Sequence, residues 1–175
     1  CSGTSMASPH TSGAVALLAE KWADDHSGAI LSAAMAKAIL VNSAVDMGAA
    51  DIPNFNEGWG RINITRALAP DVDTQYKDQE ELLTQVGQQW TLQTSVADPT
   101  RPLKVTLAWS DAPGAVGANP ALVNNLDLTV TVGGTTYLGN AFSGGWSVAG
   151  GSADALNNLE NVFAQNPSGS VTIVV

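Results

Sequence analysis

The spacing of apolar and polar positions changes near the middle of the chain. Apolar and small residues recur at helical intervals over residues 5–23 and 30–44, and a short helix is indicated over 64–68. After Pro70 the period becomes two, and β-branched or alternating residues fill four ranges: 90–96, 103–109, 126–132 and 171–175. The pair Gly133-Gly134 next to one of these runs indicates a β-hairpin. The pattern therefore predicts helices first, and then an all-β sandwich of the jelly-roll kind.

This change of period divides the chain into three segments. Residues 1–70 form the helical part, residues 71–85 are a polar, acidic linker, and residues 86–175 form the sandwich. The first helix is built from small residues on all sides, which predicts close neighbours all around it. Nothing in so short a chain surrounds such a helix, and the final run 171–175 is expected to be a strand that is cut short. We therefore expect a fragment that is truncated at both ends.

Charge argues against one class of partner, and the length of the apolar runs argues against a membrane span. The net charge is −9 and the pI is about 4.3, which argues against binding to nucleic acid. Residues 71–175 carry ten acids and three bases, which predicts an acidic surface, a cation site or both. No apolar run approaches the roughly 20 residues that span a bilayer, so no membrane span is predicted. The single cysteine, Cys1, leaves no internal disulfide.

The first residues place a serine where acyl transfer is favoured. A polar Gly3-Thr4-Ser5 turn leads into the first helix, and the hydroxyl of Thr4 or Ser5 is predicted to cap it. A serine there lies at the positive end of the helix dipole, where backbone N–H groups stabilise a developing oxyanion. The predicted chemistry is attack of the Ser5 hydroxyl on a carbonyl carbon. The alternative is a serine that only caps the helix, as most serines at helix starts do.

The run Gly3–His10, followed by Ser12-Gly13, resembles the nucleophile segment of the subtilisin-like serine proteases, the subtilases (peptidase family S8). The segment Asn56–Asn63 is similar to one near the end of their catalytic domain, so the resemblance covers about residues 1–69. It implies that residues 1–70 are the C-terminal, mainly helical piece of an α/β catalytic domain. It also implies an extracellular serine endopeptidase that acts on proteins or peptides, with Ser5 as nucleophile and no cofactor for catalysis.

The nucleophile of subtilisin comes last in the chain order Asp, His, Ser. The resemblance therefore places the acid and the base before Cys1, in an upstream part of the same catalytic domain. Neither histidine is expected to be the base, because His10 points away along the helix of Ser5 and His26 lies in a polar segment that predicts a solvated loop. By itself, the 175-residue chain is expected to be inactive and poorly folded.

The second half resembles the C-terminal β-barrel domain of alkaline subtilases of the KP-43 type, through residues 107–113, 122–128 and 157–162. Some members of that group carry calcium. Five oxygen-bearing side chains of these segments are candidates for a structural calcium site: Asp111, Asn125, Asp127, Glu160 and Asn161. The alternative is that Asp111 and Asn125 form Asx-turns and that Asp127 is only exposed.

Two other functions remain open. In the first, the parent protein is a pseudoprotease or adhesion module, and its upstream sequence lacks the aspartate or the histidine. In the second, the sandwich alone is the working unit and binds protein or glycan. Trp146 is the best anchor for the second function, and the competing interpretation is a loop aromatic folded onto the sandwich. Gly58 and Gly60 are interpreted as turn residues rather than as substrate contacts.

Overall fold

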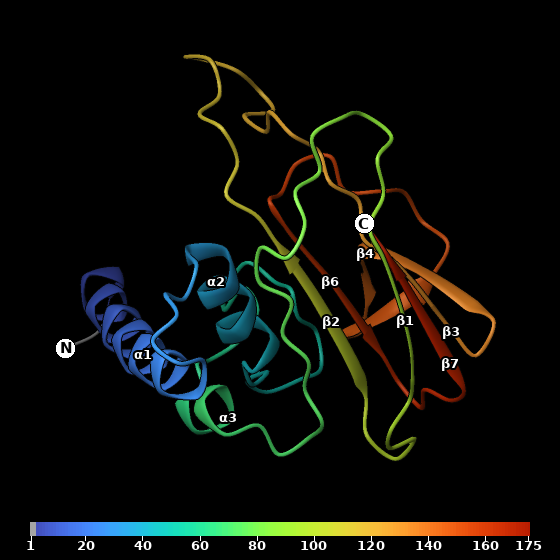
Figure 1. Cartoon of the computed structure of the whole chain (residues 1–175), viewed down its shortest axis with the longest axis horizontal. Coiled ribbons are helices and arrows are strands. Elements are labelled where there is room, and N and C mark those ends of the chain that lie inside the picture. Colours follow the sequence, from blue (N-terminus) through green and yellow to red (C-terminus); the bar gives the residue numbers. More distant parts are fainter. Residues whose placement is uncertain (1–2) are drawn as a thin grey trace.

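The computed structural model describes residues 3–175. Within this range, helices come first and strands follow, as the change of period predicts (Figure 1). The helices are α1 (Thr4–Asp25), α2 (Ala33–Asn42) and α3 (Ile64–Leu68). The strands are β1 (Thr91–Ser95), β2 (Leu103–Ala108), β3 (Thr129–Val132), β4 (Thr135–Ser143), β5 (Trp146–Ala149), β6 (Leu159–Ala164) and β7 (Ser170–Val174).

The strands form two antiparallel sheets that are compatible with a β-sandwich. One sheet has the order β1-β7-β3-β4-β5, and the other pairs β2 with β6. Their facing sides share a core in which Val130, Val162 and Val171 are almost completely buried. Burial of these β-branched side chains, at about 25 cal/mol per Å² of apolar surface, stabilises the pair of sheets. The predicted hairpin at Gly133-Gly134 joins β3 to β4.

The helix boundaries follow local hydrogen bonds. The second helix begins at Ala33 rather than near residue 30, because the Ser32 side chain accepts a hydrogen bond from the Met35 amide at 2.9 Å and caps it. The short helix α3 has the predicted bounds, and Asn63 caps it by accepting from the Arg66 amide. No helix within residues 3–175 is long and apolar enough to span a membrane.

The first half of α1 has no neighbours among residues 3–175. Every residue from Thr4 to Gly13 is exposed, and burial begins at Ala14. The later turns pack against α2 and α3 through a cluster that includes Leu18, Trp22 and Ile39. The stretch of small residues that predicted neighbours on every side is therefore solvent-exposed in this structure.

The helical part and the sandwich share a joint in which α2 packs on β2. The Asn42 side-chain amide donates to the Thr106 hydroxyl at 2.9 Å, and that hydroxyl donates to Asn161 Oδ1 at 2.6 Å. Next to this chain of bonds, the Trp59 ring packs edge-on against Phe142 and Phe163, with centroids 5.3 and 6.0 Å away. Trp59 thus anchors one part to the other.

The turn that carries Trp59 needs glycine. Gly60 has φ +104°, and a Cβ there would lie 2.5 Å from the Val45 carbonyl oxygen. The interpretation of these glycines as turn residues is consistent with this geometry. Residues 71–85 contain no helix or strand, and Asp71 and Asp78 tie the segment to Arg101 and Ser32.

Candidate active site

Ser5 lies in the first turn of α1, with its side chain exposed. The prediction that Thr4 or Ser5 caps this helix is wrong, because Gly3 occupies the cap position. The Gly3 carbonyl accepts from the amides of Met6 and Ala7 at 3.0 and 3.1 Å. Gly3 adopts φ +137°, a conformation that side chains disfavour, so the helix begins one residue earlier than a serine cap would require.

This start of the helix leaves Ser5 available for chemistry. Its Oγ has no hydrogen-bond partner among residues 3–175. Its backbone N–H belongs to the first turn, where amides have no acceptor within the helix and point toward the positive end of the dipole. An exposed hydroxyl beside such an amide can attack a carbonyl carbon and stabilise the oxyanion that forms.

The two histidines are engaged elsewhere. His10 Nδ1 lies 2.6 Å from the Met6 carbonyl oxygen, one turn back on α1. His26 stacks on Trp22 with ring centroids 3.9 Å apart, and its Nδ1 lies 2.9 Å from the Trp22 carbonyl oxygen. His26 is exposed, as predicted for a solvated segment, but its ring rests on the end of α1. Neither ring nitrogen is bonded to Ser5 within the described residues.

Glu160 is a buried carboxylate with an unusual environment. Its side chain is 1% exposed, and Oε2 accepts from the Leu128 amide at 2.6 Å. Oε1 is buried and has no partner among the described residues. Burial raises the pKa of Glu160 to about 7, and the negative charges of Asp127 and Asp154 act in the same direction. The Leu128 hydrogen bond opposes this rise in pKa without cancelling it.

The other predicted calcium ligands point to different places. Asn161 follows Glu160 in β6, so their side chains lie on opposite faces, and Asn161 is bonded to Thr106 at the joint. Asp111 accepts hydrogen bonds from the loop that follows it, as an Asx-type residue does. Asn125 donates to Asp127 at 3.1 Å, and both are exposed. These contacts do not gather all five around one point, and calcium binding stays a prediction. Of the other four residues, Asp127 is the one whose negative charge acts on Glu160.

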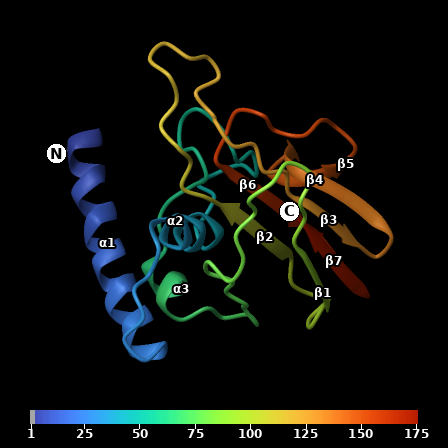
Figure 2. The same ribbon diagram turned by 45° about the horizontal axis from the view of Figure 1, so that its top comes forward.

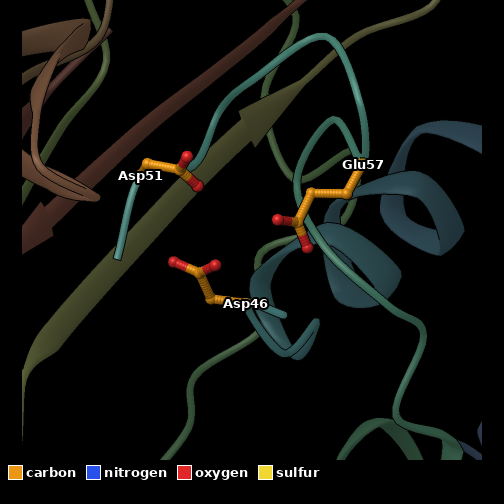
Figure 3. Close-up of side chains that lie close together, drawn as sticks. All are labelled: Asp46, Asp51 and Glu57. Carbon is orange, nitrogen blue, oxygen red and sulfur yellow. The ribbon is translucent and has the colours of Figure 1, made fainter. Parts of the chain in front are cut away.

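The structure brings together three carboxylates that the sequence did not indicate. Asp46, Asp51 and Glu57 each place an oxygen within 4.8 Å of the others, in the loop after α2 (Figure 3). Asp46 Oδ1 is buried and has no hydrogen-bond partner among residues 3–175, while Glu57 accepts from the Met47 amide at 2.9 Å. Carboxylate oxygens are ligands of hard cations such as calcium. Within residues 3–175, this is the group of acidic side chains best arranged to hold one. Asp46 and Asp51 are 5 residues apart, and Asp51 and Glu57 are 6 residues apart, in an irregular loop. This spacing matches no recognisable sequence motif, so the sequence alone did not reveal the group.

The Glu160 environment predicts how stability depends on pH. A carboxyl whose pKa rises on folding contributes stability that is complete below about pH 4.5 and is lost as the pH rises to about 7. Glu160→Gln removes this dependence. With chelator present, we therefore expect the unfolding free energy of the variant minus that of wild type to be about 3 kcal/mol larger at pH 8 than at pH 4. Urea denaturation across this pH range measures the difference.

Glu20→Gln, which changes an exposed carboxylate on α1, serves as the control for the Glu160 experiment. The control variant should follow wild type at every pH. A difference between Glu160→Gln and wild type that stays constant with pH would contradict the assignment.

Comparison with known proteins supports the resemblance at the N-terminal end. Residues 1–60 match the model of the subtilase family, Peptidase_S8. A stretch of 67 residues is 39% identical to an extracellular serine protease of Serratia marcescens. That stretch is 38% of this chain and 6% of the Serratia protein, so the chain spans a small part of this relative's length. The matched family segment includes Ser5, α1, α2 and the loop with the three carboxylates.

Proposed function

We propose that this chain is the C-terminal part of a secreted, subtilisin-like serine endopeptidase in which Ser5 is the nucleophile. The observation that carries the proposal is a serine in the first turn of α1 that is exposed and has no hydrogen-bond partner among the described residues, inside the segment that matches the subtilase family. The Serratia relative is an extracellular serine protease, which is consistent with this proposal.

The chain's own contribution to the reaction is the nucleophile and part of the oxyanion site. Ser5 Oγ attacks the carbonyl carbon of the scissile peptide bond, and the Ser5 amide donates to the oxygen that becomes negatively charged. A histidine from the upstream part of the protein takes the hydroxyl proton and passes it to the leaving amine, and an upstream aspartate orients that histidine. Water then releases the acyl group from Ser5.

The sandwich that follows is proposed to be the C-terminal domain of a KP-43-type enzyme. Support comes from its two antiparallel sheets and from its contact with the helical part through α2 and Trp59. Trp146 is half-buried at the start of β5. It is therefore less exposed than an anchor for protein or glycan would be.

Covalent labelling tests the proposed nucleophile. A fluorophosphonate probe should react with the full-length protein, and digestion should place the adduct on the peptide that contains Ser5. Ser12→Ala, which removes another serine of α1 whose hydroxyl donates to the Ser8 carbonyl, should leave the labelling unchanged. An adduct on another residue would place the nucleophile elsewhere, and no adduct at all would argue for the pseudoprotease.

Thermal unfolding tests the calcium prediction. A cation that binds only the native state stabilises it by about 2.7 kcal/mol at a hundredfold excess over Kd. The full-length protein should therefore melt at a higher temperature in millimolar calcium than in chelator. Asp127→Ala should remove the part of the difference that the predicted site contributes, and Asp51→Asn reports on the part that the three-carboxylate group contributes. Magnesium and added sodium chloride at matched ionic strength separate binding from screening of the acidic surface. Equal melting in calcium and in chelator would leave these residues as turn formers.

A further inference from the structure

A lysine of the sandwich faces the joint with the helical part. Of the four lysines in the sequence, Lys104 is the one that lies on a strand, β2. Its neighbours Leu103 and Val105 pack against the core between the two sheets, so the side chain between them points to the opposite face of β2. Figures 1 and 2 both show α2 beside this strand, and the two elements are in contact. Lys104 therefore extends its amine from the sandwich toward the helices.

Two contacts hold the Lys104 amine in the joint. Its Nζ donates to the carbonyl of Asn42, the last residue of α2, at 3.5 Å, which is a long hydrogen bond. The ring of Phe163, the residue paired with Lys104 on β6, has its centroid 4.4 Å from Nζ. The last turn of α2 carries no basic residue, so Lys104 supplies the positive charge that the negative end of the helix dipole favours. The protonated amine thus has a favourable neighbour on each side of the joint.

These contacts do not replace the water that the amine loses on burial. An ammonium group has three N–H donors, and Nζ of Lys104 makes one long hydrogen bond and no salt bridge within the described part of the chain. Lys21 and Lys77, in contrast, each form a salt bridge with a nearby carboxylate. Burial lowers the pKa of Lys104 from 10.5 to about 8. The charged form is therefore disfavoured in the folded joint.

The charged groups that face Lys104 do not remove this cost. Arg66 on α3 repels the ammonium and lowers its pKa further, whereas Asp46 after α2 attracts it without a salt bridge among the described residues. On the sandwich side, Phe163 is uncharged. A second lysine, Lys37 on α2, donates across the joint to an amide side chain of the β5–β6 loop at 2.9 Å, and burial lowers its pKa as well. The joint thus disfavours positive charge from both of its sides.

We propose that Lys104 makes the joint between the sandwich and the helices sensitive to pH, so that the contact is weaker while the amine is protonated and stronger once it has lost the proton. The cost of the charge falls on the joint, because the amine regains water when β2 and α2 separate. Lys104 has a pKa of about 8 in the folded protein and of 10.5 in the unfolded chain, so its contribution to stability is lowest below about pH 8 and rises up to about pH 10.5. This inference does not depend on the chemistry at Ser5.

Urea denaturation of the full-length protein tests the pH dependence. Lys104→Met keeps the length of the side chain and removes the amine. Between pH 7 and pH 10.5, the folding equilibrium constant of this variant divided by that of wild type should fall on the order of a hundredfold. Lys77→Met, which removes an exposed and ion-paired lysine, is the control and should keep a nearly constant ratio. A constant ratio for Lys104→Met would overturn the proposal.

Lys104→Arg separates the charge from the packing of the side chain. The guanidinium stays protonated over the whole range, so this variant cannot gain stability by losing a proton. Its ratio to wild type should fall with pH as that of Lys104→Met does, and it should be less stable than Lys104→Met at each pH. An arginine variant that gains stability with pH in parallel with wild type would contradict the role of the amine.

Hydrogen exchange at pH 7 shows where in the molecule the charge acts. At one pH the intrinsic exchange rates of wild type and Lys104→Met are the same except next to the changed residue. The variant should slow exchange in α2 and β2 more than in the β3–β4 hairpin, which belongs to the other sheet. Equal slowing in all segments would assign Lys104 to overall stability and would overturn the proposal. None of these measurements reads activity at Ser5, so this inference and the proposed function fail separately.

Discussion

Ser5→Ala in the full-length protein is expected to lower kcat for peptide hydrolysis by about 10⁶, the figure known for loss of the nucleophile in subtilisin itself. The loss is large because no neighbouring group replaces the attacking oxygen. The nearest histidine on α1 is bonded to the Met6 carbonyl, and Ser12 is bonded to the Ser8 carbonyl. Steady-state hydrolysis of a fluorogenic peptide by the full-length protein measures the change.

The Ser5→Ala variant should retain its fold. Ser5 is exposed, has no hydrogen-bond partner among the described residues and does not cap α1, so the midpoint of thermal unfolding should shift little. Ser12→Ala provides the matched control on the same helix and should keep most of the activity. Activity in the Ser5 variant close to that of the Ser12 variant would show that another residue performs the attack.

Phe163→Ala is expected to cost about 3–5 kcal/mol of unfolding free energy, the largest effect on stability that we predict. The Phe163 side chain is 1% exposed and lies where the sandwich meets the helical part. Its ring contacts Phe142 edge-on with centroids 5.4 Å apart, and the Lys104 ammonium lies 4.4 Å from its centroid. Truncation leaves a cavity and removes both of these contacts.

Phe55→Ala is the matched control for this measurement. Phe55 is fully exposed in the loop after α2, so the same chemical change should alter stability by less than about 0.5 kcal/mol. Urea denaturation followed by tryptophan fluorescence compares the two variants with wild type. Similar small losses for both would mean that the joint between sandwich and helices is loosely packed.

The sequence predicted those features that depend on local pattern. The helical period gave α1 and α3 to within about two residues, and alternation gave β1, β2 and β7 closely. The two glycines after β3 gave the hairpin, because a tight turn requires their backbone freedom. The segment around Ser5 gave the start of α1 to within one residue, and the chemistry at Ser5 stays a prediction.

Features set by distant residues were not predictable in the same way. Strand β6 is buried along its whole length, yet Glu160 and Asn161 make its sequence resemble a polar turn. Its Asn161 amide is satisfied by the Asn140 side chain and its Phe163 amide by Ser147, which no local pattern reveals. The helix cap at Gly3 was missed because preference for a serine cap competes with the conformational freedom of glycine.

The joint at α2 changes what counts as a separable piece of this protein. A recombinant piece that starts at residue 86, where the period of the sequence suggests a domain boundary, would leave the outer face of β2 and β6 without α2 and Trp59. Asn161 would keep Thr106 but lose the link to Asn42, and one side of the Phe163 ring would face water. A solvent-exposed aromatic ring beside a two-stranded sheet whose outer face is also exposed favours self-association. For soluble expression of the sandwich, the piece should therefore begin before α2, at a residue that sequence periodicity alone would assign to a different domain.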